Sequence, residues 1–310
     1  MVDSALDAAI RRAAFDHLRA LSAGRDYVTS DELARGFEFN SERIPLVNPR
    51  RGIFKPRQLK YLLSIRTVFP KPGNKIWYDD QRQIHQALYQ SNEFVDYAFM
   101  GNNPDAADNR WLREASVEQV PIVYFIGVAP GRFLSVSPAY IARCDRERLL
   151  AKVGFGEPSE YLGGKFGDNV PARKYALRTV KQRMHQATFR EAIISAYEGR
   201  CAISGLPEGR LLDAAHIVED GHEALGQPTV RNGLLLSKVH HAAFDAHLIG
   251  VDPDFKVHVS GRLMQQKDGP ILEAFKAVHL SSLRLPARHN DCPDRDRLAK
   301  RFETFRARDH

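Results

Sequence analysis

The sequence has no long uninterrupted hydrophobic run. Its longest apolar stretch, Val120–Ala129, contains Pro121 and Gly127 and is much shorter than the ~20 residues that a membrane-spanning helix needs. The first residues are small and acidic and lack the charged-then-apolar pattern of a secretory signal. From these absences we predict a cytoplasmic protein that has no membrane partner.

Cysteine is scarce as well. The chain has only Cys144, Cys201 and Cys292, which lie far apart and form no C-x-x-C pair. An odd number of cysteines without paired spacing supports neither a zinc ribbon nor a disulfide framework. We therefore expect three reduced and mostly buried thiols.

The apolar content suffices for two domains of ordinary size. Of the 310 residues, 43% are hydrophobic and 9% are aromatic, which argues against extensive disorder. Glycines cluster between Gly154 and Asn169, where large aliphatic residues are few. We predict an N-terminal domain at residues 1–155, a linker at residues 156–171 and a C-terminal domain at residues 172–310.

The charge balance is basic, with a formal net charge of +7 and a pI of about 9.3. Lysine and arginine displace counterions from phosphates, so this surplus suits a polyanionic partner without identifying one. A helix predicted at Ala172–Tyr197 is especially rich in basic residues. Such a helix face is either simply solvated or follows phosphate groups.

The N-terminal half mixes helices and strands. Periodic apolar residues predict a helix at Ala5–Leu21, and a second, short helix begins at Ser30. The other predicted elements are the strands Leu62–Phe69, Lys75–Asp79, Phe94–Met100 and Val120–Val128 and the helices Gln81–Gln90 and Asn109–Ala115. Strands dominate this stretch, so we predict an α+β, barrel-like domain rather than alternating βαβ units.

The C-terminal half carries polar residues in a pattern with chemical meaning. His216 follows a short apolar run, so a strand would hold it as rigidly as a general base requires. Asn232 opens a second apolar strand, where its amide can fix a loop. His241 and Asp245 stand four apart in a predicted helix and face the same way, and imidazole with carboxylate suits magnesium or manganese. Taken singly, each of these residues is more often structural.

In this order and spacing, the stretch from Thr188 to Ser260 resembles the ββα-metal fold of HNH endonucleases of the bacterial restriction type. The resemblance implies that His216 is the general base that activates water and that Asn232 orients the catalytic loop. It implies that His241 and Asp245 are the metal ligands on the helix. It also implies a divalent cofactor, Mg²⁺ or Mn²⁺, and double-stranded DNA as the substrate.

The sequence departs from this family at one position. Many members have a metal-binding aspartate or histidine immediately before the general base, where this chain has Ala215. The metal would then rely on His241 and Asp245 with phosphate and water, unless Asp213 assists from the strand. His240 is the alternative ligand if the helix register is shifted by one residue.

The stretch from Gly52 to Phe155 resembles, more loosely, the SRA branch of the PUA-like domains, which read modified cytosines by flipping them out of the duplex. The matching segments are residues 75–81, 95–102 and 121–125. The residues that this resemblance implies for binding a modified base are the aromatic walls Trp77, Tyr78 and Tyr97 and the carboxylate Asp80, with Asp79 as the alternative. In the alternative interpretation, Trp77, Tyr78 and Tyr97 are ordinary strand aromatics and the two aspartates belong to a polar turn.

Together these resemblances predict a modification-dependent restriction endonuclease that binds DNA containing 5-methylcytosine or 5-hydroxymethylcytosine and cuts nearby. Two alternatives stay open: an HNH endonuclease specific for unmodified sequence or structure, and a modified-DNA reader with a decayed nuclease. Cutting both strands with one small site suggests a homodimer. The predicted fold is α+β, with an SRA/PUA-like β-barrel domain flanked by helices and a C-terminal ββα-metal domain.

Overall fold

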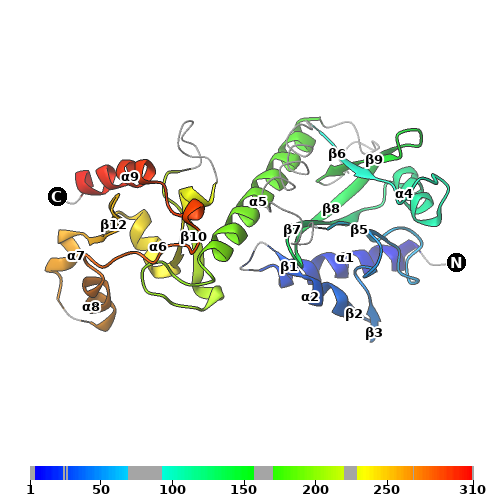
Figure 1. The fold of residues 1–310 in the computed structure, drawn as a ribbon. Coiled ribbons are helices and arrows are strands. Elements are labelled where there is room, and N and C mark those ends of the chain that lie inside the picture. The colour runs from blue at the N-terminus through cyan, green and yellow to red at the C-terminus, as the bar shows by residue number, and fades with distance from the viewer. Residues whose placement is uncertain are drawn as a thin grey trace. The chain divides into compact units, whose positions relative to one another are not determined.

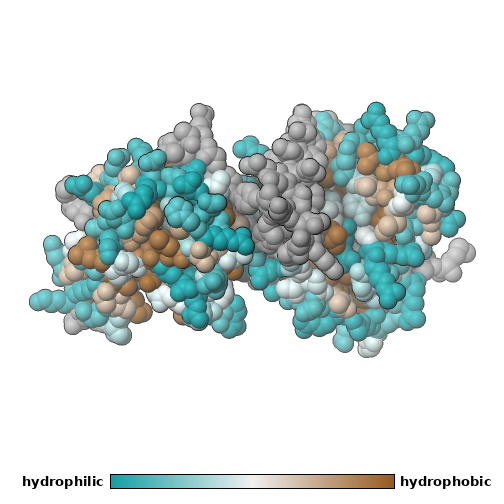
Figure 2. Space-filling view, in the orientation of Figure 1, coloured by the Kyte–Doolittle hydropathy of each residue, from teal (hydrophilic) through white to brown (hydrophobic). Residues whose placement is uncertain are grey.

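The computed structural model describes residues 4–23, 25, 27–68, 93–156, 170–219, 229–267 and 269–308. The chain divides into two compact units, Met1–Ala187 and Thr188–His310 (Figure 1). Hydrophilic side chains make up most of the visible face of each unit, with smaller hydrophobic patches between them (Figure 2). Within the described ranges, none of the helices combines the length and apolar character that crossing a bilayer requires.

The first unit is built on a seven-stranded sheet. Its strands are β1 (Val28–Thr29), β4 (Ile53–Phe54), β5 (Ser64–Thr67), β6 (Val95–Ala98), β7 (Ile122–Ala129), β8 (Arg132–Asp145) and β9 (Leu150–Phe155). The order is β4-β5-β7-β8-β9-β6, with β1 also paired to β8, and β5 runs parallel to β7. Among these described strands the two ends, β4 and β6, do not pair. The curved sheet is therefore an open half-barrel among the described strands, and the predicted mixed α+β class is confirmed.

Both faces of this sheet are covered, because the central strand β7 is apolar along its length. Its residues Ile122, Tyr124, Ile126 and Val128 lie in one core, which also includes residues of α4 (Ala107–Glu118). Val123 and Phe125 lie in a second core with α1 (Ser4–Leu21) and α2 (Ser30–Arg35). Successive strand residues point to opposite faces, so an unbroken apolar run is what a strand buried on both sides requires.

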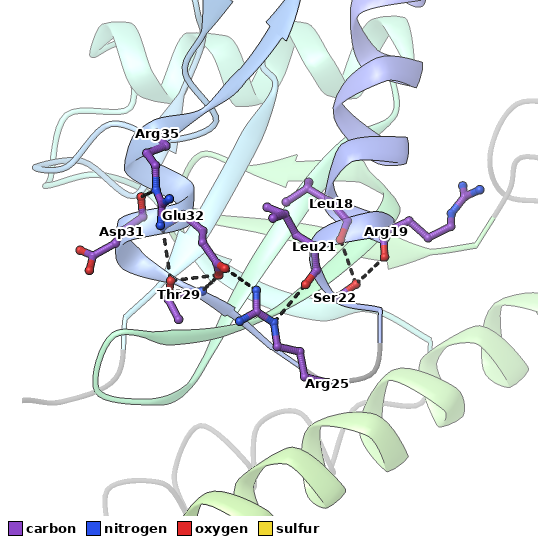
Figure 3. Close-up of polar contacts among 9 residues, drawn as sticks. All are labelled: Leu18, Arg19, Leu21, Ser22, Arg25, Thr29, Asp31, Glu32 and Arg35. Carbon is purple, nitrogen blue, oxygen red and sulfur yellow. Dashed lines mark hydrogen bonds and ion pairs between the residues drawn. The ribbon is translucent and has the colours of Figure 1, made fainter. Parts of the chain in front are cut away.

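Polar contacts fix the connection between α1 and α2 (Figure 3). Thr29 caps α2, because its hydroxyl accepts a hydrogen bond from the Glu32 amide while the Glu32 carboxylate accepts one from the Thr29 amide. The Arg25 guanidinium donates to Glu32 and, at 3.0 Å, to the carbonyl of Leu21 at the end of α1. A short hairpin of β2 (Phe37–Phe39) and β3 (Glu42–Ile44) follows.

The helix α5 (Val170–Ala196) contributes to both units. Its first part supplies Leu177, Val180, Met184 and Ala187 to a core of the first unit. Its second part supplies Phe189 and Ile193 to the core of the second unit. The boundary between the units therefore falls inside this helix, whereas the sequence placed the start of the C-terminal domain at residue 172. The predicted strand Lys75–Asp79, the predicted helix Gln81–Gln90 and most of the predicted linker lie outside the described residues.

The second unit contains a ββα arrangement followed by a hairpin and three helices. β10 (Leu212–His216) pairs antiparallel with β11 (Gly233–Ser237), and α6 (Lys238–Asp245) follows β11 directly. The later elements are β12 (Ile249–Val251), β13 (Val257–Val259), α7 (Gly261–Gln265), α8 (Pro270–Ala277) and α9 (Arg295–Arg308). The β10–β11 pair packs closely on α5 at Gly233, where a Cβ atom would lie 2.3 Å from Cδ1 of Ile193. Only glycine fits there without a shift of the helix side chains.

Candidate active site

The hairpin and α6 bring three residues singled out in the sequence into one part of the second unit. His216 is the last residue of β10 and pairs with Gly233. Asn232 immediately precedes β11, and His241 lies in the middle of α6. Ser237 begins the helix as its N-cap, since its hydroxyl accepts a hydrogen bond from the His240 amide at 3.3 Å.

Asn232 clamps the backbone that follows His216. Its side chain is fully buried, and its Nδ2 donates to the Val218 carbonyl at 2.9 Å. Its Oδ1 accepts a hydrogen bond from the Val218 amide at 3.0 Å, and its own carbonyl accepts one from Ile217. These bonds hold the turn after β10 in one conformation, which is the positioning role that the sequence resemblance implies for this asparagine.

Aromatic packing fixes the plane of the His216 ring. The ring stacks on Phe189 of α5, with the two ring centroids 4.1 Å apart and the ring planes 9° apart. Phe189 is itself buried, whereas His216 is only partly buried. His216 is therefore held rigidly at the end of a strand, as a general base must be, and it is partly exposed although its Nε2 atom is itself buried.

His241 lies between two carboxylates. Its Nδ1 is 3.8 Å from an oxygen of Asp213 on β10, and its Nε2 is 3.3 Å from an oxygen of Asp245 on α6. All three side chains are partly exposed, with Asp245 the most exposed. The structure thus brings Asp213 to His241, as the sequence had left open.

The Asp213–His241 pair fits a hard divalent ion. A separation of 3.8 Å is too long for a hydrogen bond. Two ligand atoms that share one ion through bonds of about 2.1 Å can lie up to about 4.2 Å apart. One imidazole nitrogen can bind an ion while the other donates to a carboxylate, so Asp245 fits the orienting position. In the part of the chain that the structure describes, no three histidine, cysteine or acidic side chains converge on one metal position, which leaves coordination positions for water and phosphate.

These elements lie within a stretch with a recognisable family pattern. Residues 201–252 match the family model described as HNH endonuclease. The second unit contains an HNH endonuclease domain. The matched stretch includes β10, β11 and α6 with His216, Asn232 and His241, and it confirms the HNH unit that the sequence predicted.

Comparisons of the whole chain add little to this assignment. No curated protein matches the chain. Among solved structures it is similar to one described as "Modification dependent TagI restriction endonuclease". That match covers 83% of this chain and 86% of the other, with 13% sequence identity and a TM-score of 0.31. A TM-score this low does not establish a shared fold.

Arg301 of α9 supports the end of α6 in the HNH domain, and nothing in the sequence had singled it out. Its guanidinium donates to the Phe244 carbonyl at 2.9 Å and lies 3.8 Å from a carboxylate oxygen of Asp245. Burial lowers the pKa of Arg301, while Asp245 and Glu219 act in the opposite direction. Arg301 therefore fixes the last helical turn and offsets the charge of Asp245. No local motif could reveal it, because it lies 57 residues after Phe244.

His240, the alternative ligand, lies in a different cluster of the HNH domain. Its Nδ1 is 2.9 Å from the Ser237 hydroxyl and 3.5 Å from Sγ of Cys201, and its ring meets Phe275 edge-on. Sγ of Cys201 also accepts hydrogen bonds from the amides of Ser237 and Ser204. Burial raises the pKa of the Cys201 thiol, but the hydrogen bonds from His240 and Ser204 outweigh burial and lower it to about 6. His241, not His240, therefore faces the carboxylates.

The residues predicted to bind a modified base are only partly described. Trp77, Tyr78 and Asp80, with the alternative Asp79, lie outside the described residues. Tyr97 lies on β6 in the core of the first unit with 8% of its surface exposed, and its hydroxyl donates to the Gly52 carbonyl at 3.0 Å. Burial raises the pKa of this hydroxyl. So little exposed ring surface favours the alternative in which Tyr97 supports the sheet.

Proposed function

We propose that this protein is a metal-dependent endonuclease that hydrolyses phosphodiester bonds in double-stranded DNA. The observation that carries the proposal is the arrangement in the HNH domain. There, a strand-end histidine, a buried asparagine clamp and a helix histidine between two carboxylates lie on one ββα scaffold. This scaffold presents a base and a metal-binding pair, so hydrolysis by an activated water requires no nucleophilic side chain.

His216 takes a proton from the attacking water in this proposal. An imidazole accepts a proton readily near neutral pH, and the stack on Phe189 keeps the ring from rotating away. Asn232 acts on His216 indirectly, by holding the Val218 backbone that follows it. Removing the His216 side chain should therefore lower the cleavage rate more than removing the Asn232 side chain.

Asp213 and Nδ1 of His241 would hold the divalent ion, which stabilises the charge that develops on the leaving oxygen. Asp245, with an oxygen 3.3 Å from Nε2 of His241, would orient the ring. Two distances support this division of roles. The 3.3 Å between Nε2 of His241 and the Asp245 carboxylate approaches hydrogen-bond length, whereas the 3.8 Å between Nδ1 of His241 and the Asp213 carboxylate does not. The nearby Arg301 also makes Asp245 a poorer cation ligand.

We further propose that the first unit selects duplexes containing 5-methylcytosine or 5-hydroxymethylcytosine by base flipping. The support is the resemblance of residues 52–155 to the SRA branch of PUA-like domains. In this proposal Trp77, Tyr78 and Asp80 bind the flipped base, and Tyr97 supports the sheet. A homodimer would place one HNH site on each strand.

Plasmid cleavage tests the proposal. Methylated and unmethylated plasmid are incubated with wild-type protein and with His216→Ala, with Mg²⁺, with Mn²⁺ and with chelator. We expect metal-dependent cutting of methylated plasmid by the wild type, and a loss of ~10²–10⁴-fold in His216→Ala with DNA binding retained. Equal cutting of both plasmids would support the alternative that reads unmodified DNA. Binding of methylated DNA without any cutting would mean a decayed nuclease.

A further inference from the structure

We propose that the exposed face of α5 in the first unit binds the phosphate backbone of a DNA duplex. The inference rests on the proposed function, because DNA is the substrate there, and it adds a binding surface outside the HNH site. The face is defined by the exposed Lys174 and Arg178 and the half-buried Lys181 and His185, and we call it the α5 basic face.

Most of the net positive charge of the chain lies in this helix. The residues from Val170 to Arg190 include six lysines and arginines and no aspartate or glutamate. Without these six, the 45 lysines and arginines of the chain fall to 39, against 38 acidic residues. The rest of the chain is therefore almost neutral, and attraction to a polyanion concentrates on this helix.

The helix geometry collects the charges on one side. The positions 174, 178, 181 and 185 repeat every three or four residues, so they form one stripe along α5. Leu177, Val180, Met184 and Ala187 form a second stripe, roughly 110° around the helix from the basic one, and are buried in the core of the first unit. Packing thus fixes the direction in which the basic stripe points.

Two of the four residues of the α5 basic face are exposed. Lys174 and Arg178 are exposed, and neither forms an ion pair with any residue that the structure describes. Arg173 behaves differently, since it is buried and pairs with Glu93 at 3.0 Å. Tyr175, 74% exposed, lies beside the stripe. Exposed cations that form no ion pair lose little free energy when a phosphate replaces the water around them.

The stripe has the length of a short duplex segment. At about 1.5 Å of rise per residue, Lys174 and His185 lie roughly 16 Å apart along the helix. That distance corresponds to roughly five phosphates of one strand at 3.4 Å each along the duplex axis. A straight row of basic side chains would therefore contact several phosphates of one backbone and carry no sequence information.

Salt-dependent binding tests this inference. Anisotropy of a labelled unmethylated duplex is measured in chelator, so that cutting does not interfere, for wild type, Lys174→Gln/Arg178→Gln and the control Arg12→Gln/Arg110→Gln. The control removes two exposed arginines from α1 and α4 of the same unit. Each lost phosphate contact lowers the salt slope by about 0.9, so the α5 variant should lose about 1.8. Its affinity deficit relative to wild type should shrink by about 12-fold between 50 and 200 mM salt.

The outcomes separate this inference from the proposed function. An unchanged slope in Lys174→Gln/Arg178→Gln, or an equal loss in the control, overturns the α5 basic face while metal-dependent cleavage by the wild type still stands. A loss confined to the α5 variant supports the face even if the wild type cuts nothing. If Lys174→Gln/Arg178→Gln binds DNA as the wild type does but no longer binds anionic lipid vesicles that the wild type binds, the face belongs to a membrane contact and the proposal is overturned.

Discussion

Replacing Asn232 by alanine tests how the HNH site is held. The change removes both hydrogen bonds to Val218, at 2.9 and 3.0 Å, inside a fully buried environment. Leaving the Val218 amide and carbonyl unpaired costs about 1–3 kcal/mol each, so the second unit should lose roughly 2–6 kcal/mol of stability. The freed backbone also releases His216, so cleavage should fall by at least about 10-fold, toward the ~10²–10⁴ that an absent base costs.

Asn109 provides a matched control in the first unit. It is equally buried, its Oδ1 accepts from the Met100 amide at 2.8 Å, and its Nδ2 donates to the Met100 carbonyl at 3.0 Å. Asn109→Ala therefore removes the same kind of clamp without touching the HNH domain. It should lower stability by a similar amount and leave the cleavage rate unchanged at a temperature where the variant is folded.

The assay can separate the two units. Both tryptophans, Trp77 and Trp111, belong to the first unit. In urea unfolding, Asn109→Ala should move the fluorescence transition, whereas Asn232→Ala should move the circular dichroism transition more than the fluorescence one. Cleavage is then measured below both transitions. Normal turnover by folded Asn232→Ala would refute the positioning role and leave Asn232 as a stabilising residue only.

Three further predictions concern the metal, the thiol and the base pocket. Asp213→Asn should raise the Mg²⁺ concentration for half-maximal cleavage more than Asp245→Asn, whose orienting role is worth roughly 10–100-fold; metal titrations that give the reverse order would exchange the two roles. The second unit should gain stability from pH 6 to pH 9, because Cys201, with its pKa lowered from 9.0 to about 6, is ionised there when folded and protonated when unfolded. This contribution disappears as the pH falls below 6, and Cys201→Ser should abolish the rise in urea titrations. Trp77→Ala should weaken binding to methylated duplex by about 1–3 kcal/mol and barely affect unmethylated duplex. Tyr97→Phe should cost about 1 kcal/mol of stability and leave the preference for methylated DNA unchanged; a changed preference would return Tyr97 to the pocket.

Local sequence patterns were sufficient to predict most elements near the candidate site. The apolar run before His216, the asparagine that opens the next strand and the helix carrying His241 all appear in β10, β11 and α6. Each depends on spacing within a few residues, where strand and helix periodicity acts directly. The apolar run in β7 was predictable for the same reason, since its length required burial.

Contacts between distant residues could not be predicted in this way. Adjacent histidines on a helix differ by about 100° in direction, so choosing His241 over His240 required knowing where Asp213 and Cys201 lie. Arg301 reaches α6 from a helix much further along the chain. The half-barrel form of the described sheet could not be predicted either, because strand content does not determine whether the edge strands meet.

The sharing of α5 between two cores limits how this protein can be dissected. A fragment beginning at residue 172 would retain Leu177, Val180 and Met184 with no core to receive them. Such a bare apolar stripe promotes self-association, so the isolated fragment should aggregate unless these positions are made polar. A fragment ending at residue 155 would leave the same site in the first unit open. The HNH domain therefore shares α5 with the first unit, and a chimera needs its junction near Thr188, within the helix.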